Sequence, residues 1–203
     1  MKTYLNRVTS SLAMNCKKCG KKGDIKFVEG FLCSGCFLQI IEKRVRKYVR
    51  LNKFFSKGDK ILVCDELSEF LIRDILNGLP IEIVRRKVSK NDVFSDKTVL
   101  KLLKTKKITK VVFSWTADDE SSGFLGGFLE GRLADSGDAR FVKLLRNISE
   151  EDAAVFAKLN GIKFERSKFG RAHQLIEQIS KNHPDVKYGL LRAGEKLDKT
   201  TGE

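Results

Sequence analysis

The sequence predicts an α/β domain with a parallel sheet, preceded by a small module built around four cysteines. Three observations predict this arrangement. Apolar, strand-like runs alternate with helix-like segments along most of the chain, two Cys-x-x-Cys pairs lie near the N-terminus, and 203 residues suffice for one ordinary core plus a small appendage. Residues 16–36 are too few to fold by burial alone, so metal binding would supply much of their stability.

The two cysteine pairs have the spacing of a structural metal site. Thirteen residues separate them, so each Cys-x-x-Cys turn presents two thiolates to one tetrahedral ion. Such a shell is coordinatively closed, which favours structural zinc, with iron as an alternative; a redox dithiol pair and unligated core cysteines are the other interpretations. Ile25–Val28 and Phe31–Leu32 are expected to form a hairpin between the pairs. The expected metal ligands are Cys16, Cys19, Cys33 and Cys36.

A basic helix is predicted next, from Phe37 to Lys53. Its apolar residues recur at spacings of three or four, with charged residues between them. A basic stripe of this kind holds phosphate backbones without reading sequence, and neighbouring aromatic residues offer stacking surfaces. The alternative is a solvated helix face with its aromatic side chains in the core. The residues expected to bind RNA are Lys43, Arg44, Arg46, Lys47, Arg50 and Lys53.

Strands and helices alternate after the basic helix, as in a parallel α/β sheet. The expected strands are Lys60–Cys64, Ile81–Val84 and Lys110–Ser114. The expected helices are Ser68–Asn77, Ser95–Lys106 capped by Ser95, Ala117–Glu130, Ser149–Asn160 with Ser149 and Asp152 as a variant capping box, and Arg171–Asn182.

This pattern divides the chain into four segments. Residues 1–36 hold the N-terminal tail and the four-cysteine zinc module, and residues 37–57 hold the connecting basic helix. Residues 58–194 form the α/β domain. Residues 195–203 are polar and are expected to be a disordered tail.

The composition favours an intracellular protein with a polyanionic partner. Lys and Arg outnumber Asp and Glu by 40 to 26, giving a formal net charge of +14, and nucleic acid is the commonest partner of such a chain. The sequence has neither a signal-peptide pattern nor an apolar run long enough to span a membrane. Paired cysteines used for metal rather than disulfides predict a cytoplasmic location.

These segments resemble the tRNA-thiolating branch of the PP-loop ATP pyrophosphatase family, which has an adenine nucleotide alpha hydrolase-like domain. In that family, cysteine knuckles lead into a helix that starts with Phe, followed by a strand and a phosphate loop. Cys33-Ser-Gly-Cys36-Phe37 and Phe55-Ser-Lys-Gly-Asp-Lys-Ile-Leu-Val63 follow that order. Farther on, the run from Val112 to Glu120 is similar to the family's Ala-Thr-Gly-His-Asn-x-Asp-Asp segment. The resemblance covers roughly residues 16–190.

The chain departs from the family at the catalytic elements. The family binds ATP with Ser-Gly-Gly-x-Asp-Ser after the first strand, where glycine amides approach the phosphates. This chain has Cys64-Asp-Glu-Leu-Ser-Glu-Phe-Leu71 there, with carboxylates and no glycine. Trp115 and Thr116 stand where the family has His and Asn. No catalytic or ATP-binding residue is therefore expected.

The cysteines of the main domain agree with that expectation. Catalytic members use additional cysteines there, three of which hold an iron-sulfur cluster in one branch. Outside the knuckles this chain has only Cys64, so neither that cluster nor a two-cysteine sulfur relay can be built within one chain. Cys64, at the end of a predicted strand, is expected to be a small core residue. Asp118 and Asp119 are expected to begin a helix rather than to perform catalysis.

What the resemblance implies is the non-catalytic second subunit of a tRNA wobble-uridine 2-thiolation complex. Its partners would be an active PP-loop paralogue, in a heterodimer, and tRNA; neither a membrane nor DNA is expected. A zinc-ribbon RNA-binding adaptor unrelated to thiolation is one alternative. A self-sufficient ATP-dependent tRNA sulfurtransferase with an altered loop is the other.

Overall fold

The chain divides into two compact units, Met1–Ile40 and Ile41–Glu203. Helix α1 (Ser34–Asn52) begins in the first unit and continues in the second. No described helix is both long and apolar enough to cross a membrane. The computed structural model describes residues 14–27, 30–105, 107–131, 138–168 and 170–201.

The first unit is a hairpin that leads into the first turn of α1. Strands β1 (Ile25–Phe27) and β2 (Gly30–Leu32) pair antiparallel, as predicted, while the expected strand residue Val28 lies outside the described residues. The ring of Phe27 meets that of Phe37 edge-on, with centroids 5.8 Å apart. So small an apolar contact contributes little stability, and units of this size usually need a bound metal or a disulfide as well.

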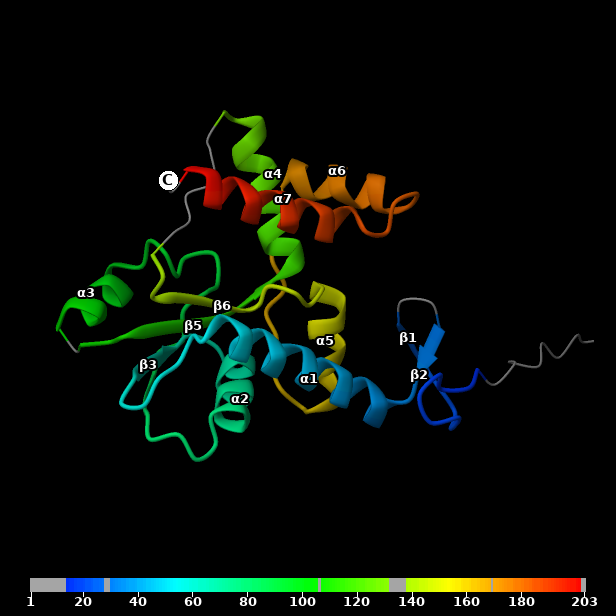
Figure 1. Ribbon diagram of the computed structural model, residues 1–203, viewed down its shortest axis with the longest axis horizontal. Helices are drawn as coiled ribbons and strands as arrows, with labels where there is room; N and C mark the ends of the chain where they lie inside the picture. Colours follow the sequence, from blue (N-terminus) through cyan, green and yellow to red (C-terminus); the bar gives the residue numbers. More distant parts are fainter. Residues whose placement is uncertain (1–13, 28–29, 106, 132–137, 169, 202–203) are drawn as a thin grey trace, which may run out of the picture. The chain divides into compact units, whose positions relative to one another are not determined.

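The second unit contains a four-stranded parallel sheet, which confirms the predicted fold class (Figure 1). The strand order is β4-β3-β5-β6, and every neighbouring pair is parallel. Three strands correspond to predicted ones, whereas β6 was not predicted. The strands are β3 (Lys60–Val63), β4 (Glu82–Arg85), β5 (Lys110–Thr116) and β6 (Phe141–Leu145).

Helices cover the sheet, and side-chain alternation along the strands builds a core on each face. On one face, Leu62, Val111 and Phe113 pack with Val99 and Leu103. On the other face, α2 contacts β3 and β5. The helices that follow α1 are α2 (Glu66–Ile75), α3 (Lys97–Thr105), α4 (Ala117–Leu129), α5 (Glu150–Leu159), α6 (Arg171–Ser180) and α7 (Val186–Thr201).

Helix α7 corrects the expectation of a disordered tail from residue 195. It runs alongside α4 and α6 (Figure 1) and continues to Thr201. A Cβ built at Gly194 would lie 3.2 Å from the ring of Phe124, so a glycine allows the two helices to approach closely. Glu195 then pairs with Arg146 at 2.9 Å. The polar composition of this segment suggested an unstructured tail. The sequence did not reveal the contacts that order it, because each involves a residue distant in the chain.

The helix caps are partly as predicted. Ser149 accepts a hydrogen bond from the Asp152 N–H and caps α5, as expected. The cap of α3 is Asp96 rather than Ser95, because the Asp96 carboxylate accepts from the N–H groups of Thr98 and Val99, each at 2.8 Å. Ser95 is one residue too early to reach these donors.

Candidate metal centre, basic surface and sheet edge

The basic residues of α1 divide between two sides of the helix. Lys43, Arg46, Lys47 and Arg50 are exposed, and their spacing of three or four residues places them along one side. Lys53 follows the helix and is also exposed. Arg44 differs, because it is half-buried near Asp152 of α5 and Tyr188 of α7. Burial raises the pKa of both groups, and the Arg44 charge opposes the rise.

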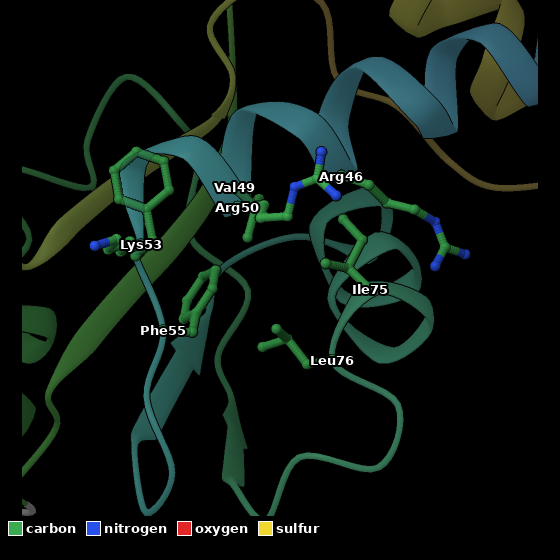
Figure 2. Close-up of a pocket in the computed structure, with 8 residues that line it drawn as sticks. Arg46, Val49, Arg50, Lys53, Phe55, Ile75 and Leu76 are labelled. Carbon is green, nitrogen blue, oxygen red and sulfur yellow. The ribbon is translucent and has the colours of Figure 1, made fainter.

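Aromatic side chains lie at the C-terminal end of this stripe. The ring of Phe54 stands edge-on to Tyr48, at a centroid distance of 5.2 Å, and to Phe55, at 6.4 Å. All three are half-buried. Phe54 and Phe55 also line a pocket between the ends of α1 and α2, which contains both apolar and basic side chains (Figure 2). The sequence indicated the basic residues but not this pocket, because α2 supplies its other wall.

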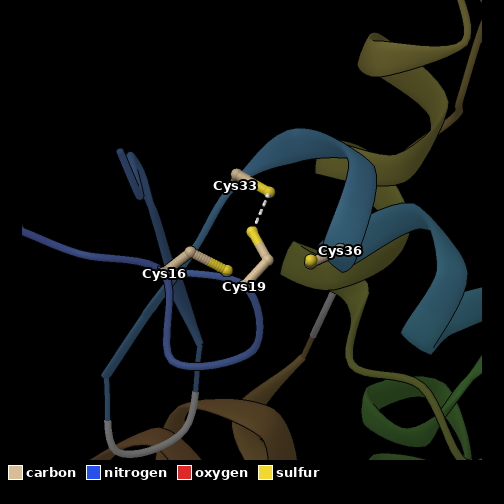
Figure 3. A group of neighbouring side chains, drawn as sticks. All are labelled: Cys16, Cys19, Cys33 and Cys36. Carbon is tan, nitrogen blue, oxygen red and sulfur yellow. Dashed lines mark hydrogen bonds between the residues drawn. The ribbon is translucent and has the colours of Figure 1, made fainter. Parts of the chain in front are cut away.

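The four predicted metal ligands come together at the N-terminus. Their sulfur atoms all lie within 4.8 Å of one another (Figure 3), and the Sγ atoms of Cys19 and Cys33 are 3.6 Å apart. Three cysteines come from loops, and Cys36 lies in the first turn of α1. Gly20, with a φ of 72°, makes the tight turn after the first pair. The cysteine cluster therefore has the geometry of a metal site.

The electrostatics of the cysteine cluster favour a thiolate at Cys16. Backbone hydrogen bonding, first from Cys33 and then from Cys19 and Lys18, outweighs burial and lowers the pKa of Cys16 to about 6. Burial raises the pKa of Cys36 to about 12. A bound dication reverses that rise, because metal ligation removes the thiol proton. Metal binding by this cluster therefore releases protons and weakens at acid pH.

The carboxyl edge of the sheet is the second place where a ligand is expected. In a parallel sheet, ligands bind where the chain leaves neighbouring strands in opposite directions, which here is between β3 and β5. Asp65 fills this position. Its carboxylate accepts from the N–H of Ser68 at 2.8 Å, which caps α2, and from the N–H of Ser114 of β5 at 2.8 Å. The α2 N-terminus therefore already holds an anion from its own chain.

The surroundings of Asp65 carry charges of both signs. A pocket of about 490 Å³ opens beside it, and carboxylates line this pocket together with basic residues. Burial raises the pKa of Asp65, although the N–H donors oppose the rise. Cys64 is 1% exposed in the core, as predicted, and burial raises its thiol pKa to about 12.

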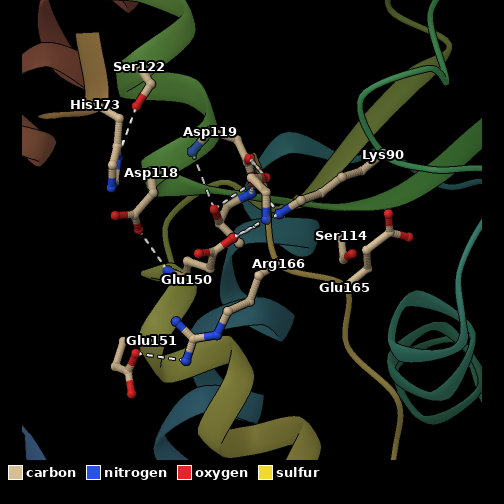
Figure 4. A network of polar contacts seen from close by, with 12 residues as sticks. Lys90, Ser114, Asp118, Asp119, Ser122, Glu150, Glu151, Glu165, Arg166 and His173 are labelled. Atoms are coloured by element: carbon tan, nitrogen blue, oxygen red, sulfur yellow. Dashed lines mark hydrogen bonds and ion pairs between the residues drawn. The ribbon is translucent and has the colours of Figure 1, made fainter. Parts of the chain in front are cut away.

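A buried lysine joins two carboxylates in a polar network near the start of α4 (Figure 4). Lys90 is 4% exposed and binds Asp119 at 2.9 Å and Glu150 at 3.3 Å. Ser167 adds a backbone donor to Glu150 at 2.7 Å and a hydroxyl contact to Asp119. Asp119 also forms a capping box with Thr116 at the start of α4. Asp119 thus lies in the first turn of a helix, as predicted, while Lys90, Glu150 and Ser167 were missed.

The neighbouring Asp118 has a similar structural role. Its carboxylate accepts from the N–H of Glu150 at 2.7 Å and pairs with Lys187 at 2.6 Å. Asp118, His173 and Glu177 lie close enough for their ligand atoms to hold a metal ion. Lys187 Nζ, however, also pairs with Glu177 at 2.6 Å. A lysine ammonium therefore supplies the positive charge at this cluster.

Comparison with known proteins supports the fold. No protein-family model matches the sequence, and no curated protein matches it. A solved structure of the U34-tRNA thiolase NcsA from Methanococcus maripaludis, with its 4Fe-4S cluster, is similar over 93% of this chain and 88% of that one. The TM-score is 0.72 and the sequence identity is 16%. The likeness shows that this chain has the same fold as that thiolase.

Proposed function

We propose that this chain is the non-catalytic subunit of a tRNA wobble-uridine 2-thiolation complex. The observation that carries the proposal is Asp65, whose carboxylate fills the α2 N-terminus where a protein of this fold would need amides for a phosphate. The fold is that of a U34-tRNA thiolase, whereas the ligand position is occupied by the chain itself. An active paralogue, in a cytoplasmic heterodimer, would then perform the chemistry.

The basic side of α1 is the proposed contribution to tRNA binding. Its exposed lysines and arginines lie along one side of the helix, in a chain with a net charge of +14. Such a stripe binds phosphates irrespective of base sequence. Half-buried Arg44 is expected to contribute through its contacts within the protein rather than to RNA.

We propose zinc as the ion of the four-cysteine cluster. A separation of at most 4.8 Å between sulfur atoms suits four thiolates on a single tetrahedral ion. An iron-sulfur cubane holds its thiolates farther apart, because each binds a different iron atom. Metal analysis of the purified protein tests this assignment: stoichiometric zinc supports it, and the visible absorption of thiolate-bound iron contradicts it.

Affinity purification of the tagged protein from its own cells tests the proposed function. We expect a stoichiometric paralogue with an intact Ser-Gly-Gly-x-Asp-Ser loop, together with tRNA. Calorimetric titration of the isolated chain with ATP should show no binding. The absence of such a paralogue would overturn the subunit assignment, and ATP binding by the isolated chain would instead support an enzyme in its own right.

A further inference from the structure

The pocket between the ends of α1 and α2 combines an apolar interior with a basic rim. Its volume is about 440 Å³, within the range of ligand-sized pockets. Figure 2 shows Phe55, Ile75 and Leu76 around one space below α1. The basic side chains of the pocket are those of Arg46, Arg50 and Lys53. An anionic ligand with a flat, apolar part would match both kinds of surface.

Two of the three cations are available to such a ligand. Arg46 is engaged by Asp74, at 2.5 Å. Within the described ranges, neither Arg50 nor Lys53 forms an ion pair. Both side chains are exposed, so an incoming anion would not first have to break an internal contact.

The backbone at Lys53 has a left-handed conformation that allows a substitution to be designed there. Lys53 has a φ of 50° and ends α1 in a left-handed turn, with hydrogen bonds from Lys53 N to Arg50 O and from Phe54 N to Val49 O. Glycine is the usual residue in this turn because it has no Cβ to strain the backbone. A lysine at this position therefore carries a backbone strain that a glycine would relieve.

We propose that this pocket binds one unpaired nucleotide of RNA. The base would pack against the ring of Phe55 and the apolar floor, and its phosphate would lie between Arg50 and Lys53. Lys43 and Lys47 continue the basic side along α1, where adjoining phosphates would follow. An extended polyanion therefore fits better than an isolated anion. The inference rests on the proposed RNA-binding role of α1 and adds a specific subsite to it.

The test is a fluorescence-anisotropy titration of the full-length protein with a labelled, unstructured 12-nucleotide RNA over a series of salt concentrations. We expect Phe55→Leu to weaken binding about tenfold without changing the salt dependence, because stacking is lost but no charge is removed. Phe55→Tyr should keep the wild-type affinity. Thermal melting of each variant establishes that it is folded.

Lys53→Gly separates charge from folding. It removes a cation while relieving the left-handed backbone, so binding should weaken and the salt slope should fall by about 0.7, with an unchanged or higher melting temperature. Lys107→Gly is the matched control, because Lys107 has the same φ of 50° outside the pocket. It should leave RNA affinity within twofold of wild type.

The outcomes distinguish this subsite from the proposed function. RNA binding that depends on Lys43 and Lys47 but not on Phe55 or Lys53 would overturn the subsite and leave the basic surface intact. Failure of the wild-type protein to bind any RNA would contradict both. If Phe55→Leu instead releases a copurifying protein and leaves RNA affinity unchanged, the pocket docks a protein segment and the nucleotide assignment is wrong.

Discussion

The Asp65 carboxylate caps the N-terminus of α2, so its removal should lower the free energy of unfolding by a measurable amount. Asp65→Ala removes the contacts to the N–H groups of Ser68 and Ser114. The free energy of unfolding should fall by about 1–3 kcal/mol, because a helix cap is lost and buried donors are left without partners. Chemical denaturation measures the change. Glu66→Ala, at the exposed neighbour, should cost less than about 0.5 kcal/mol.

Glu120 is a second residue whose charge state affects stability. Burial raises its pKa, but Lys143 at 2.7 Å and Arg146 at 3.0 Å outweigh this, so the net pKa is lowered from its ordinary 4.5. The unfolded state then binds more protons than the folded state just below pH 4.5. The stabilisation is present above that pH and is lost as the pH falls through the lowered value.

Glu120→Gln should therefore flatten the acid side of the stability profile. Melting temperatures measured from pH 6 down to pH 3 should fall less steeply for this variant than for wild type. The variant should also be less stable near neutral pH, where the ion pairs are present. An acid profile identical to that of wild type would show that these pairs contribute no linkage. Glu66→Gln controls for the removal of one carboxylate at an exposed site.

At the scale of elements, local patterns predicted those structures whose stabilising contacts are close in sequence. Helix α1 and strand β3 follow from apolar spacing alone. Strand β6 and the whole of α7 were missed, because their stability comes from β5 and α4 rather than from their own composition. The cap of α3 was misassigned by one residue, which is the usual uncertainty at a helix end.

The contact between α4 and α7 is an element-scale prediction that a matched pair of substitutions tests. Gly194→Leu should destabilise the fold by about 1–3 kcal/mol, because Phe124 already lies 3.2 Å from the position of a Cβ. Gly189→Leu, in the same helix but facing open space, should be neutral or stabilising by up to about 1 kcal/mol. Chemical denaturation compares the two variants. Equal effects would contradict close packing at Gly194.

At the scale of the whole molecule, the candidate sites differ in how far they could be predicted. The cysteine cluster was predictable because ligand spacing is a local property of the sequence. The Lys90 network was not, because its contacts join residues 29 and 60 positions apart. The pocket beside Lys53 shows both cases. The sequence indicates its charges, while two of its apolar side chains, Ile75 and Leu76, come from the end of a different helix, α2.

The division into two units also predicts how the molecule responds to loss of metal. The first unit has a hairpin and few buried apolar side chains, whereas the second has its own core around Leu62 and Phe113. A chelator should therefore unfold residues 16–36 and leave most of the second unit folded. Hydrogen exchange measures each unit separately.

In the metal-free protein, we expect amide protection to be lost around β1 and β2, while the amides of β3 and β5 keep protection close to that of the metal-bound protein. Cys33→Ser should reproduce this pattern without a chelator, because three ligands cannot complete the tetrahedral shell. Loss of protection in β3 and β5 would instead mean that the metal stabilises both units together. In that case metal bound by the cysteine cluster would stabilise both units rather than only the hairpin of the first.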